Sequence, residues 1–337
     1  MNGILKNKFF TLKLLALLVL SISTSLFSSG CFEANISYIR EFGTEGKGSG
    51  EFNMPTDIAV NSKGEIYICD TKNNRICVYN SNCEYVKSIG NAGVMSLKEP
   101  YGICTDAMDN IYVADTGNSR IIKFDPSGRF LMELYSTVKL GQPKDPNNSL
   151  KMPYDVAATH DGRIFVVDLS NRLLVYEPTG VCSQKLGGKG SGMSNFDVPT
   201  RVVVTNHDPS ERQYYIYVAD SFNSRVMKFN NEFKTIYEIK DKGMMQYIRD
   251  PRGLAILPNK SIILTDCGNM PIAAFTSQGV LEASGGSLGT GRGKLLSPCG
   301  VAVDVQRKKI YVSDQLQNKI MVYALHKETI REASGDN

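Results

Sequence analysis

A motif that recurs six times along the chain constrains its fold more than any other feature of the sequence. Each copy holds an apolar run that ends in aspartate, then a turn, and then a second apolar run, as in NIYVADTGNSRIIKFD from Asn110 to Asp125. The aspartates of successive copies are 45 to 53 residues apart. A period of this length indicates a repeat architecture, so we expect six similar structural units. The anchoring aspartates are Asp70, Asp115, Asp168, Asp220, Asp266 and Asp314.

A second repeated element precedes each copy and indicates how one unit folds. It contains a proline near its start, as in MPYDVAA from Met152 to Ala158, and a turn signal such as His160-Asp161-Gly162 follows it. Another turn and a further short strand come after each main copy, so a unit contains four antiparallel strands. Apolar residues at consecutive positions, such as Ile66-Tyr67-Ile68, are typical of strands covered on both faces. Radially arranged four-stranded sheets provide that cover, which predicts an all-β, six-bladed β-propeller.

The two ends of the repeat region indicate how the ring closes. The sixth unit stops after its third strand, Ile320–Ala324, and the N-terminal segment Ile36–Gly43 has the length and the final glycine of a fourth strand. We therefore predict that the N-terminal strand completes the last blade. The predicted layout is a signal peptide at 1–30, a short tether at 31–35, the propeller at 36–325 and a polar C-terminal tail at 326–337.

The first 30 residues have the layout of a secretory signal peptide. Three lysines and no acidic residue precede an apolar run from Leu14 to Ile22, and small polar residues follow it. The uncharged stretch from Leu14 to Phe27 has 14 residues. A membrane-spanning helix needs about 20, so we expect export and cleavage rather than a transmembrane anchor.

The residues around Cys31 resemble the lipobox of bacterial lipoproteins, because the small residues Ser29 and Gly30 precede the cysteine. The resemblance implies that Cys31 is lipidated and that acyl chains hold the mature protein at a membrane. Phe32 follows the cysteine, and by the habit of this family it indicates the outer membrane. An ordinary signal-peptidase site before Cys31, without a lipid, is the alternative.

The net positive charge of the chain comes mostly from the signal peptide. Lys and Arg number 38 and Asp and Glu 34, a formal net charge of +4, and three of the basic residues lie in the first 30 positions. The mature chain is therefore close to neutral and has no long block of like charges. Nucleic-acid binding, which depends on a basic surface, is not expected.

The repeated pattern resembles the NHL repeat over residues 36–325: a proline, one variable residue and Gly-Val/Ile-Ala, then Asp-Thr/Ser-x-Asn-x-Arg. The resemblance implies a six-bladed NHL-type propeller. The fifth and sixth copies depart from it, with Pro271 and Lys319 in place of the arginine. Because the Asp and Arg recur around the ring, we predict structural roles, in which the Asp binds backbone N–H groups and the Arg pairs with an acid. The repeated arginines are Arg75, Arg120, Arg172 and Arg225.

Function is expected where the repeats differ. The two residues after each repeated proline begin the innermost strand, near the central channel, and they vary from unit to unit. Two tyrosines, two arginines and two acids are among them, which predicts a site for a polar ligand or a peptide end. A polar, hydrated rim without a ligand is the alternative. The predicted binding residues are Asp57, Tyr101, Tyr154, Asp155, Arg201 and Arg252.

Catalytic residues are not evident from the sequence. The amidating-lyase relatives of NHL proteins use His ligands for a metal, but the three histidines of this chain lie in turns or after the last strand. Gluconolactonase-like propellers hold Ca²⁺ with Glu, Asn and Asp. Asp57 and Asp155 are the acids of the variable set, and Arg201 in the same set would oppose a cation.

The sequence therefore predicts a non-catalytic, monomeric envelope lipoprotein that needs no metal or cofactor. Its propeller is expected to bind a protein, peptide or glycan partner, for example in the assembly of a surface or secreted complex. The alternative is a propeller hydrolase or lyase with a metal centred in the channel. The seven cysteines beyond Cys31 do not have the spacing of a disulfide framework or a zinc site.

Overall fold

The computed structural model describes residues 36–90, 96–134, 149–205, 213–240, 248–268 and 270–326. The predicted signal peptide at 1–30, the lipidation at Cys31, the tether at 31–35 and the polar tail after residue 326 lie outside the described residues. Within the described ranges, no helix is long and apolar enough to cross a membrane.

Four separate sheets each contain four antiparallel strands in chain order, as the repeats predict. The first contains β4 (Pro55–Val60), β5 (Ile66–Asp70), β6 (Arg75–Tyr79) and β7 (Tyr85–Ile89). The second contains β8 (Pro100–Thr105), β9 (Ile111–Asp115), β10 (Arg120–Phe124) and β11 (Phe130–Leu134). The third contains β12 (Pro153–Ala158), β13 (Ile164–Asp168), β14 (Arg172–Tyr176) and β15 (Cys182–Gly187). The fourth contains β16 (Pro199–Val204), β17 (Tyr215–Asp220), β18 (Arg225–Asn230) and β19 (Thr235–Lys240).

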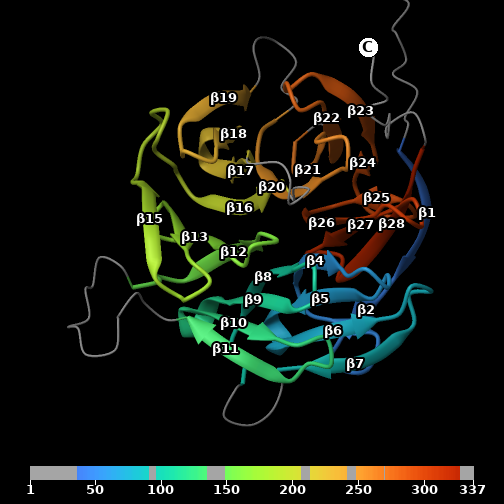
Figure 1. Ribbon diagram of the computed structural model, residues 1–337. Helices are drawn as coiled ribbons and strands as arrows, with labels where there is room; N and C mark the ends of the chain where they lie inside the picture. Colours follow the sequence, from blue (N-terminus) through green and yellow to red (C-terminus); the bar gives the residue numbers. More distant parts are fainter. Residues whose placement is uncertain are drawn as a thin grey trace, which may run out of the picture. The chain divides into compact units, whose positions relative to one another are not determined.

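An eight-stranded sheet contains the fifth and sixth repeats together with the N-terminal strand. Its β1 (Ile36–Phe42) pairs antiparallel with β28 (Lys319–Leu325), and one parallel bridge joins β1 to β23 (Leu281–Gly285). In Figure 1, β1 in blue lies beside β28 in red, although they come from opposite ends of the repeat region. The other strands of this sheet are β20 (Pro251–Ile256), β21 (Ile262–Asp266), β22 (Ile272–Phe275), β26 (Pro298–Asp304) and β27 (Lys309–Asp314).

Short elements occupy the loops between repeats. Two parallel pairs of two-residue strands lie in glycine-rich loops that lead into first strands: β2 (Thr44–Glu45) with β3 (Glu51–Phe52), and β24 (Ser287–Leu288) with β25 (Lys294–Leu295). Three 3₁₀ turns follow the repeated aspartates: η1 (Thr71–Asn73), η2 (Thr116–Asn118) and η3 (Ser221–Asn223).

The first strands of the sheets contact one another in a closed circuit. β4 contacts β8, β8 contacts β12, and the circuit continues through β16, β20 and β26 back to β4. Antiparallel sheets stacked face to face around such a circuit form a β-propeller. The all-β propeller with four-stranded blades that the repeats predict is therefore confirmed.

Apolar side chains fill the space between neighbouring sheets, because both faces of the middle strands are covered. Every residue of β5 and of β9 is buried. Ile76 and Val78 of one sheet share a packed cluster with Ile111 and Val113 of the next. Full burial of each such side chain contributes about 1.5–3 kcal/mol to folding, which explains the consecutive apolar residues of the motif.

A buried ion pair between the repeated Asp and Arg ties each of four sheets to the loop that enters it. Asp115 is fully buried, accepts the Lys98 N–H at 2.7 Å and pairs with Arg120 Nε at 2.6 Å. Arg120 also donates to the Ser96 carbonyl at 3.0 Å, in the entering loop. The corresponding pairs are Asp70–Arg75, Asp168–Arg172 and Asp220–Arg225.

Other donors hold the aspartate where the arginine is missing. In the fifth repeat, which has Pro271 at that position, Asp266 accepts two backbone N–H groups of the entering loop. In the sixth repeat, Asp314 accepts a hydrogen bond from the Gln317 side chain at 2.7 Å. A hydrogen-bonded aspartate at this point is thus kept even when its partner changes.

Side chains just before the third strand of a repeat join one repeat to the next. Asn74 accepts the Glu99 N–H at 2.8 Å, and Asn318 of the last repeat accepts the Met54 N–H of the first at 2.8 Å. Asn74 and Asn318 both have positive φ angles, 56° and 54°, which asparagine tolerates better than most residues. The same kind of bond therefore connects neighbouring repeats and also connects the last repeat to the first.

Arg120 and Arg129 provide a matched test of the repeated pair, because each pairs with an aspartate in the second repeat. Arg120→Ala leaves the buried Asp115 without its counter-charge, so we expect a loss of about 3–5 kcal/mol in the free energy of unfolding. Arg129 pairs with Asp125, but its side chain is 77% exposed, and Arg129→Ala should cause no measurable loss. Urea unfolding measures both variants, and equal effects would contradict the structural role of the repeated pair.

Candidate functional site

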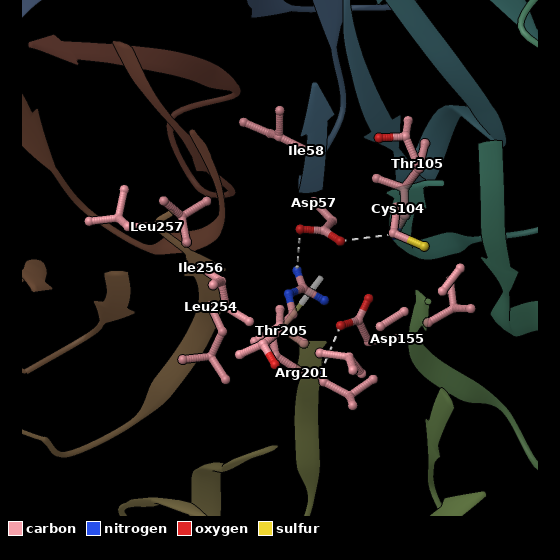
Figure 2. A pocket seen from close by; sticks show the side chains of 18 of the residues that line it. Asp57, Ile58, Cys104, Thr105, Asp155, Arg201, Thr205, Leu254, Ile256 and Leu257 are labelled. Atoms are coloured by element: carbon pink, nitrogen blue, oxygen red, sulfur yellow. Dashed lines mark hydrogen bonds and ion pairs between the residues drawn. The ribbon is translucent and has the colours of Figure 1, made fainter. Parts of the chain in front are cut away.

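A cavity of about 400 Å³ lies within the circuit of first strands, and residues of β4, β8, β12, β16, β20 and β26 line it. Figure 2 shows Asp57, Arg201 and Asp155 directed toward one another, with aliphatic side chains around them. We call these three residues the Asp–Arg–Asp cluster. It forms the charged part of the cavity lining.

A register shift in each first strand brings these residues to the cavity. The pairing of β12 with β13 shifts between Pro153 and Asp155, and that of β16 with β17 shifts between Pro199 and Arg201. The pairing of β4 with β5 also shifts after its proline. A bulge re-aims the side chains beside it, so the variable residues after the proline reach the centre while the rest of the strand keeps its packing.

Arg201 crosses the space between opposite first strands. Its Nη2 donates to the Thr56 carbonyl at 2.7 Å and lies 3.2 Å from Asp57 Oδ1. In the circuit of contacts, β16 and β4 are separated by two strands in either direction. Only 2% of the Arg201 side chain is exposed. The ion pair therefore joins opposite sides of the ring through its middle.

Each acid of the cluster also binds the strand next to its own. Asp57 Oδ2 accepts the Ile103 N–H at 2.8 Å, and Asp155 Oδ2 accepts the Val202 N–H at 2.9 Å. Asp155 Oδ1 and Arg201 Nε have no hydrogen-bond partner among the described residues. Buried polar atoms are nearly always paired, so these two atoms leave unused hydrogen-bonding capacity in the cluster.

Glycines in neighbouring strands provide the space for the two carboxyls. A Cβ at Gly102 would lie 2.3 Å from Asp155 Oδ1, and a Cβ at Gly300 would lie 2.5 Å from Asp57 Oδ1. Both distances are far shorter than a van der Waals contact, so a larger residue would displace the acid. Gly102 and Gly300 are each the second residue after a repeated proline. The sequence does not indicate which acid each glycine accommodates.

Burial and the nearby Arg201 charge act in opposite directions on the pKa values of the two carboxyls. Burial raises the pKa of Asp155 to about 8; Arg201 opposes the rise, and the Asp57 charge adds to it. Burial also raises the pKa of Asp57, again opposed by Arg201. Asp57 has the closer contact with the guanidinium. At neutral pH, Asp155 is therefore the protonated acid of the cluster and Asp57 the ionised partner of Arg201.

The other predicted binding residues do not line this cavity. The Tyr101 and Tyr154 rings pack edge to face with centroids 5.4 Å apart, and the Arg201 guanidinium lies 5.6 Å from the Tyr101 centroid. Arg252 Nε pairs with Asp250 at 2.8 Å. The structure thus brings the two acids and Arg201 together, places Tyr101 beside them, and leaves Arg252 in a separate ion pair.

Sequence reasoning missed the walls of the cavity. Val204, Leu254 and Ile256 are among the aliphatic residues that line it. Each follows a variable pair within a first strand, where the sequence shows a short apolar run. The same run is typical of an ordinary core strand, so it gave no sign of a cavity.

The described residues do not fit the metal site that the alternative prediction requires. They contain no group of three or more His, Cys, Asp or Glu side chains that could hold a metal ion. Asp57 and Asp155 are the acids of the lining, and the Arg201 guanidinium lies against Asp57 where a cation would bind. His160 and His326 are exposed and do not line the cavity. A calcium site of the gluconolactonase-like kind does not fit this set of donors.

Comparisons with known proteins agree with the fold. The NHL repeat family matches residues 52–79 and 97–124. A search of the curated proteins found no match. Among solved structures, a streptogramin B lyase superimposes with a TM-score of 0.56 at 13% identity, covering 86% of this chain and 97% of that one. Virginiamycin B lyase from Staphylococcus aureus gives 0.56 at 13% identity, covering 86% and 99%. A gluconolactonase from Xanthomonas campestris gives 0.57 at 13% identity, covering 82% and 87%.

These neighbours contradict the prediction that the chain is not an enzyme, because they are catalytic propellers. At 13% identity the likeness shows a shared fold, and that fold carries catalysis in each of them. The prediction rested on the positions of the histidines and on Arg201 opposing a cation. Neither observation bears on catalysis that needs no metal.

The protonated Asp155 makes stability depend on pH. Its pKa is raised from 3.8 to about 8 on folding, so the folded chain holds a proton that the unfolded chain releases. This contribution to stability is complete below the unfolded pKa and is lost as the pH rises through the folded one. From this group we expect the free energy of unfolding to fall by up to about 1.4 kcal/mol per pH unit as the pH rises between those values.

Asp155→Asn should remove this slope, because the amide does not titrate. Asp161→Asn, at an exposed turn acid of the same repeat, is the control and should leave the slope in place. Urea unfolding at several pH values measures all three proteins. The same slope in the native protein and in Asp155→Asn would show that Asp155 is ionised in the folded state.

Proposed function

We propose that this chain is a propeller enzyme, a lyase or hydrolase, that performs acid–base chemistry on a small molecule in its central cavity. The observation that carries the proposal is the Asp–Arg–Asp cluster, in which Arg201 pairs with Asp57 and Asp155 is a second buried acid of the cavity lining. Titratable groups with perturbed pKa values in a concave site are candidates for catalysis. The activities of the structural neighbours support a reaction of this class.

The three residues have distinct roles in the proposed reaction. Asp155 carries the proton: it gives the proton to a leaving group or, once ionised, accepts one from the substrate or from water. Arg201 stabilises negative charge on a substrate oxygen, because its guanidinium is held in place before the substrate arrives. Asp57 holds that guanidinium through the 3.2 Å ion pair and is a positioning residue.

Turnover by the purified mature protein tests this proposal. The panel consists of lactones and esters and includes gluconolactone and streptogramin B, the compounds that the neighbours' names indicate. We expect turnover of at least one compound and a loss of about 100-fold or more in kcat for Asp155→Asn. The pH profile of kcat/KM should change slope near the Asp155 pKa of about 8.

Asp161→Asn is again the control, and its activity should equal that of the native protein. Full activity in Asp155→Asn would refute the assignment of the proton carrier. No turnover of any lactone or ester in the panel would count against the lyase or hydrolase function itself.

We also propose that the eight-stranded sheet comprises two blades, which gives a six-bladed ring over residues 36–325. The strand order supports this, because β20–β23 and β26–β28 each follow the order of the four separate sheets. The pairing of β1 with β28 supports closure by the N-terminal strand, which would be the fourth strand of the last blade. A single bridge between β1 and β23 suffices to join the two blades in one sheet.

We propose further that the chain is exported, loses residues 1–30, and is anchored at the outer membrane through a lipid on Cys31. The basic start, the short apolar run and the small residues before Cys31 support this. β1 begins at Ile36, so the tether from the lipid would be short. The protein, peptide or glycan partner that the sequence suggests stays a prediction.

Mass spectrometry of the protein from membranes tests the anchor. We expect a chain that begins at Cys31 and carries acyl chains, and Cys31→Ser should release the protein from the membrane fraction. Cys182→Ser, which changes a partly exposed thiol of the propeller, is the control and should leave acylation intact. A mature chain that begins at an unmodified Cys31 would instead support ordinary signal cleavage.

A further inference from the structure

Most of the residues that line the cavity are aliphatic. Thirteen of its 21 lining residues are Ala, Val, Leu or Ile, and they come from every first strand of the circuit. Figure 2 shows Ile58, Leu254, Ile256 and Leu257 placed around the Asp–Arg–Asp cluster. An apolar ligand body that displaces water from these walls gains free energy in proportion to the area buried.

Two of the polar side chains of the walls already form hydrogen bonds with the protein itself. The Thr105 hydroxyl donates to the Val60 carbonyl at 3.2 Å, and the Thr205 hydroxyl accepts the Tyr215 N–H at 2.9 Å. A sugar would bring several hydroxyl groups into this space, and each buried hydroxyl without a partner carries a desolvation cost. The polar lining residues outside the cluster are Cys104, Thr105, Thr205 and Lys260.

The cluster itself favours an uncharged head group. Asp57 and Arg201 neutralise each other, and Asp155 retains its own proton at neutral pH. A charged head at the cluster would therefore enter a buried site without a counter-charge, because Lys260, the other charged residue of the lining, is exposed. The proton on Asp155 makes it a hydrogen-bond donor, which suits a neutral group that contains a carbonyl oxygen.

We propose that the cavity selects uncharged alkyl carbonyl compounds and rejects sugars. The carbonyl head is placed toward the Asp–Arg–Asp cluster, and the alkyl chain lies along the aliphatic walls. This inference rests on the proposed function in one respect, because it places the ligand at the same cluster. It separates this chain from a gluconolactonase, whose named substrate class is a sugar lactone.

Binding of hexanamide and gluconamide to the native mature protein tests the inference. The two amides have the same carbon chain and the same head and differ in the hydroxyl groups of gluconamide. Neither is a lactone or an ester, so binding is measured apart from the proposed turnover. Ligand-detected NMR or calorimetry should show hexanamide binding at least about tenfold more tightly, and octanamide roughly tenfold more tightly again, because two more methylene groups are buried.

Ile256→Gln and Ile236→Gln form a matched pair of variants. Ile256 lines the cavity, whereas Ile236 lies on the outer strand β19 and is 44% exposed. We expect Ile256→Gln to weaken octanamide binding about tenfold or more and Ile236→Gln to leave it unchanged. Thermal unfolding of both variants shows whether they are folded, and the comparison of the two amides does not depend on either.

The outcomes distinguish this inference from the proposed function. Gluconamide binding as tightly as hexanamide, or octanoate binding more tightly than octanamide, would overturn the inference even if turnover were found. Equal effects of the two isoleucine variants would also overturn it, because the aliphatic wall would then not be the binding surface. Selective binding of the alkyl amides without any lactone or ester turnover would support the inference and refute the proposed enzyme activity.

Discussion

The ion pair between Arg201 and Asp57 is the interaction on which the centre of this molecule depends. It links two first strands on opposite sides of the circuit, and both of its partners are almost fully buried. Removing either charge would leave the other in a low-dielectric environment, which is costly. Space around the pair exists because Gly300 and Gly102 occupy the same level of the ring. The charged residues at the centre therefore depend on the glycines of the neighbouring strands for their space.

The residues that recur in every repeat form the scaffold around that centre, and the residues that differ between repeats form the site. Each blade is closed by its own Asp–Arg pair or by a substitute, and side chains such as Asn74 and Asn318 connect neighbouring repeats. These devices lie at the ends of the strands and do not involve the residues after the proline. Those residues are consequently free to differ, which explains why a ring of similar blades can hold two acids, one arginine and three glycines at one level.

The sequence predicts the scaffold well because its determinants are local and repeated. The consecutive apolar residues and the Asp–x–x–Asn–x–Arg spacing lie within one short segment, and that segment recurs in successive repeats. The site could be predicted only as a set of variable positions. That Arg201 reaches Asp57 depends on ring closure and on the bulges, which no short segment encodes. For the same reason the sequence placed Arg252 in a common site, although its partner in the structure is Asp250.

Two acids and one guanidinium cannot all be charged in a buried site without a net charge, so the cluster is expected to hold a proton. Its position is decided by hydrogen bonds. Asp57 has both the guanidinium and the Ile103 N–H, whereas Asp155 has the Val202 N–H and one unpaired oxygen. The acid with fewer partners keeps the proton. A cation entering the cavity would displace that proton, whereas a neutral ligand leaves it in place, and this is why an uncharged ligand and an acid–base role for Asp155 are compatible.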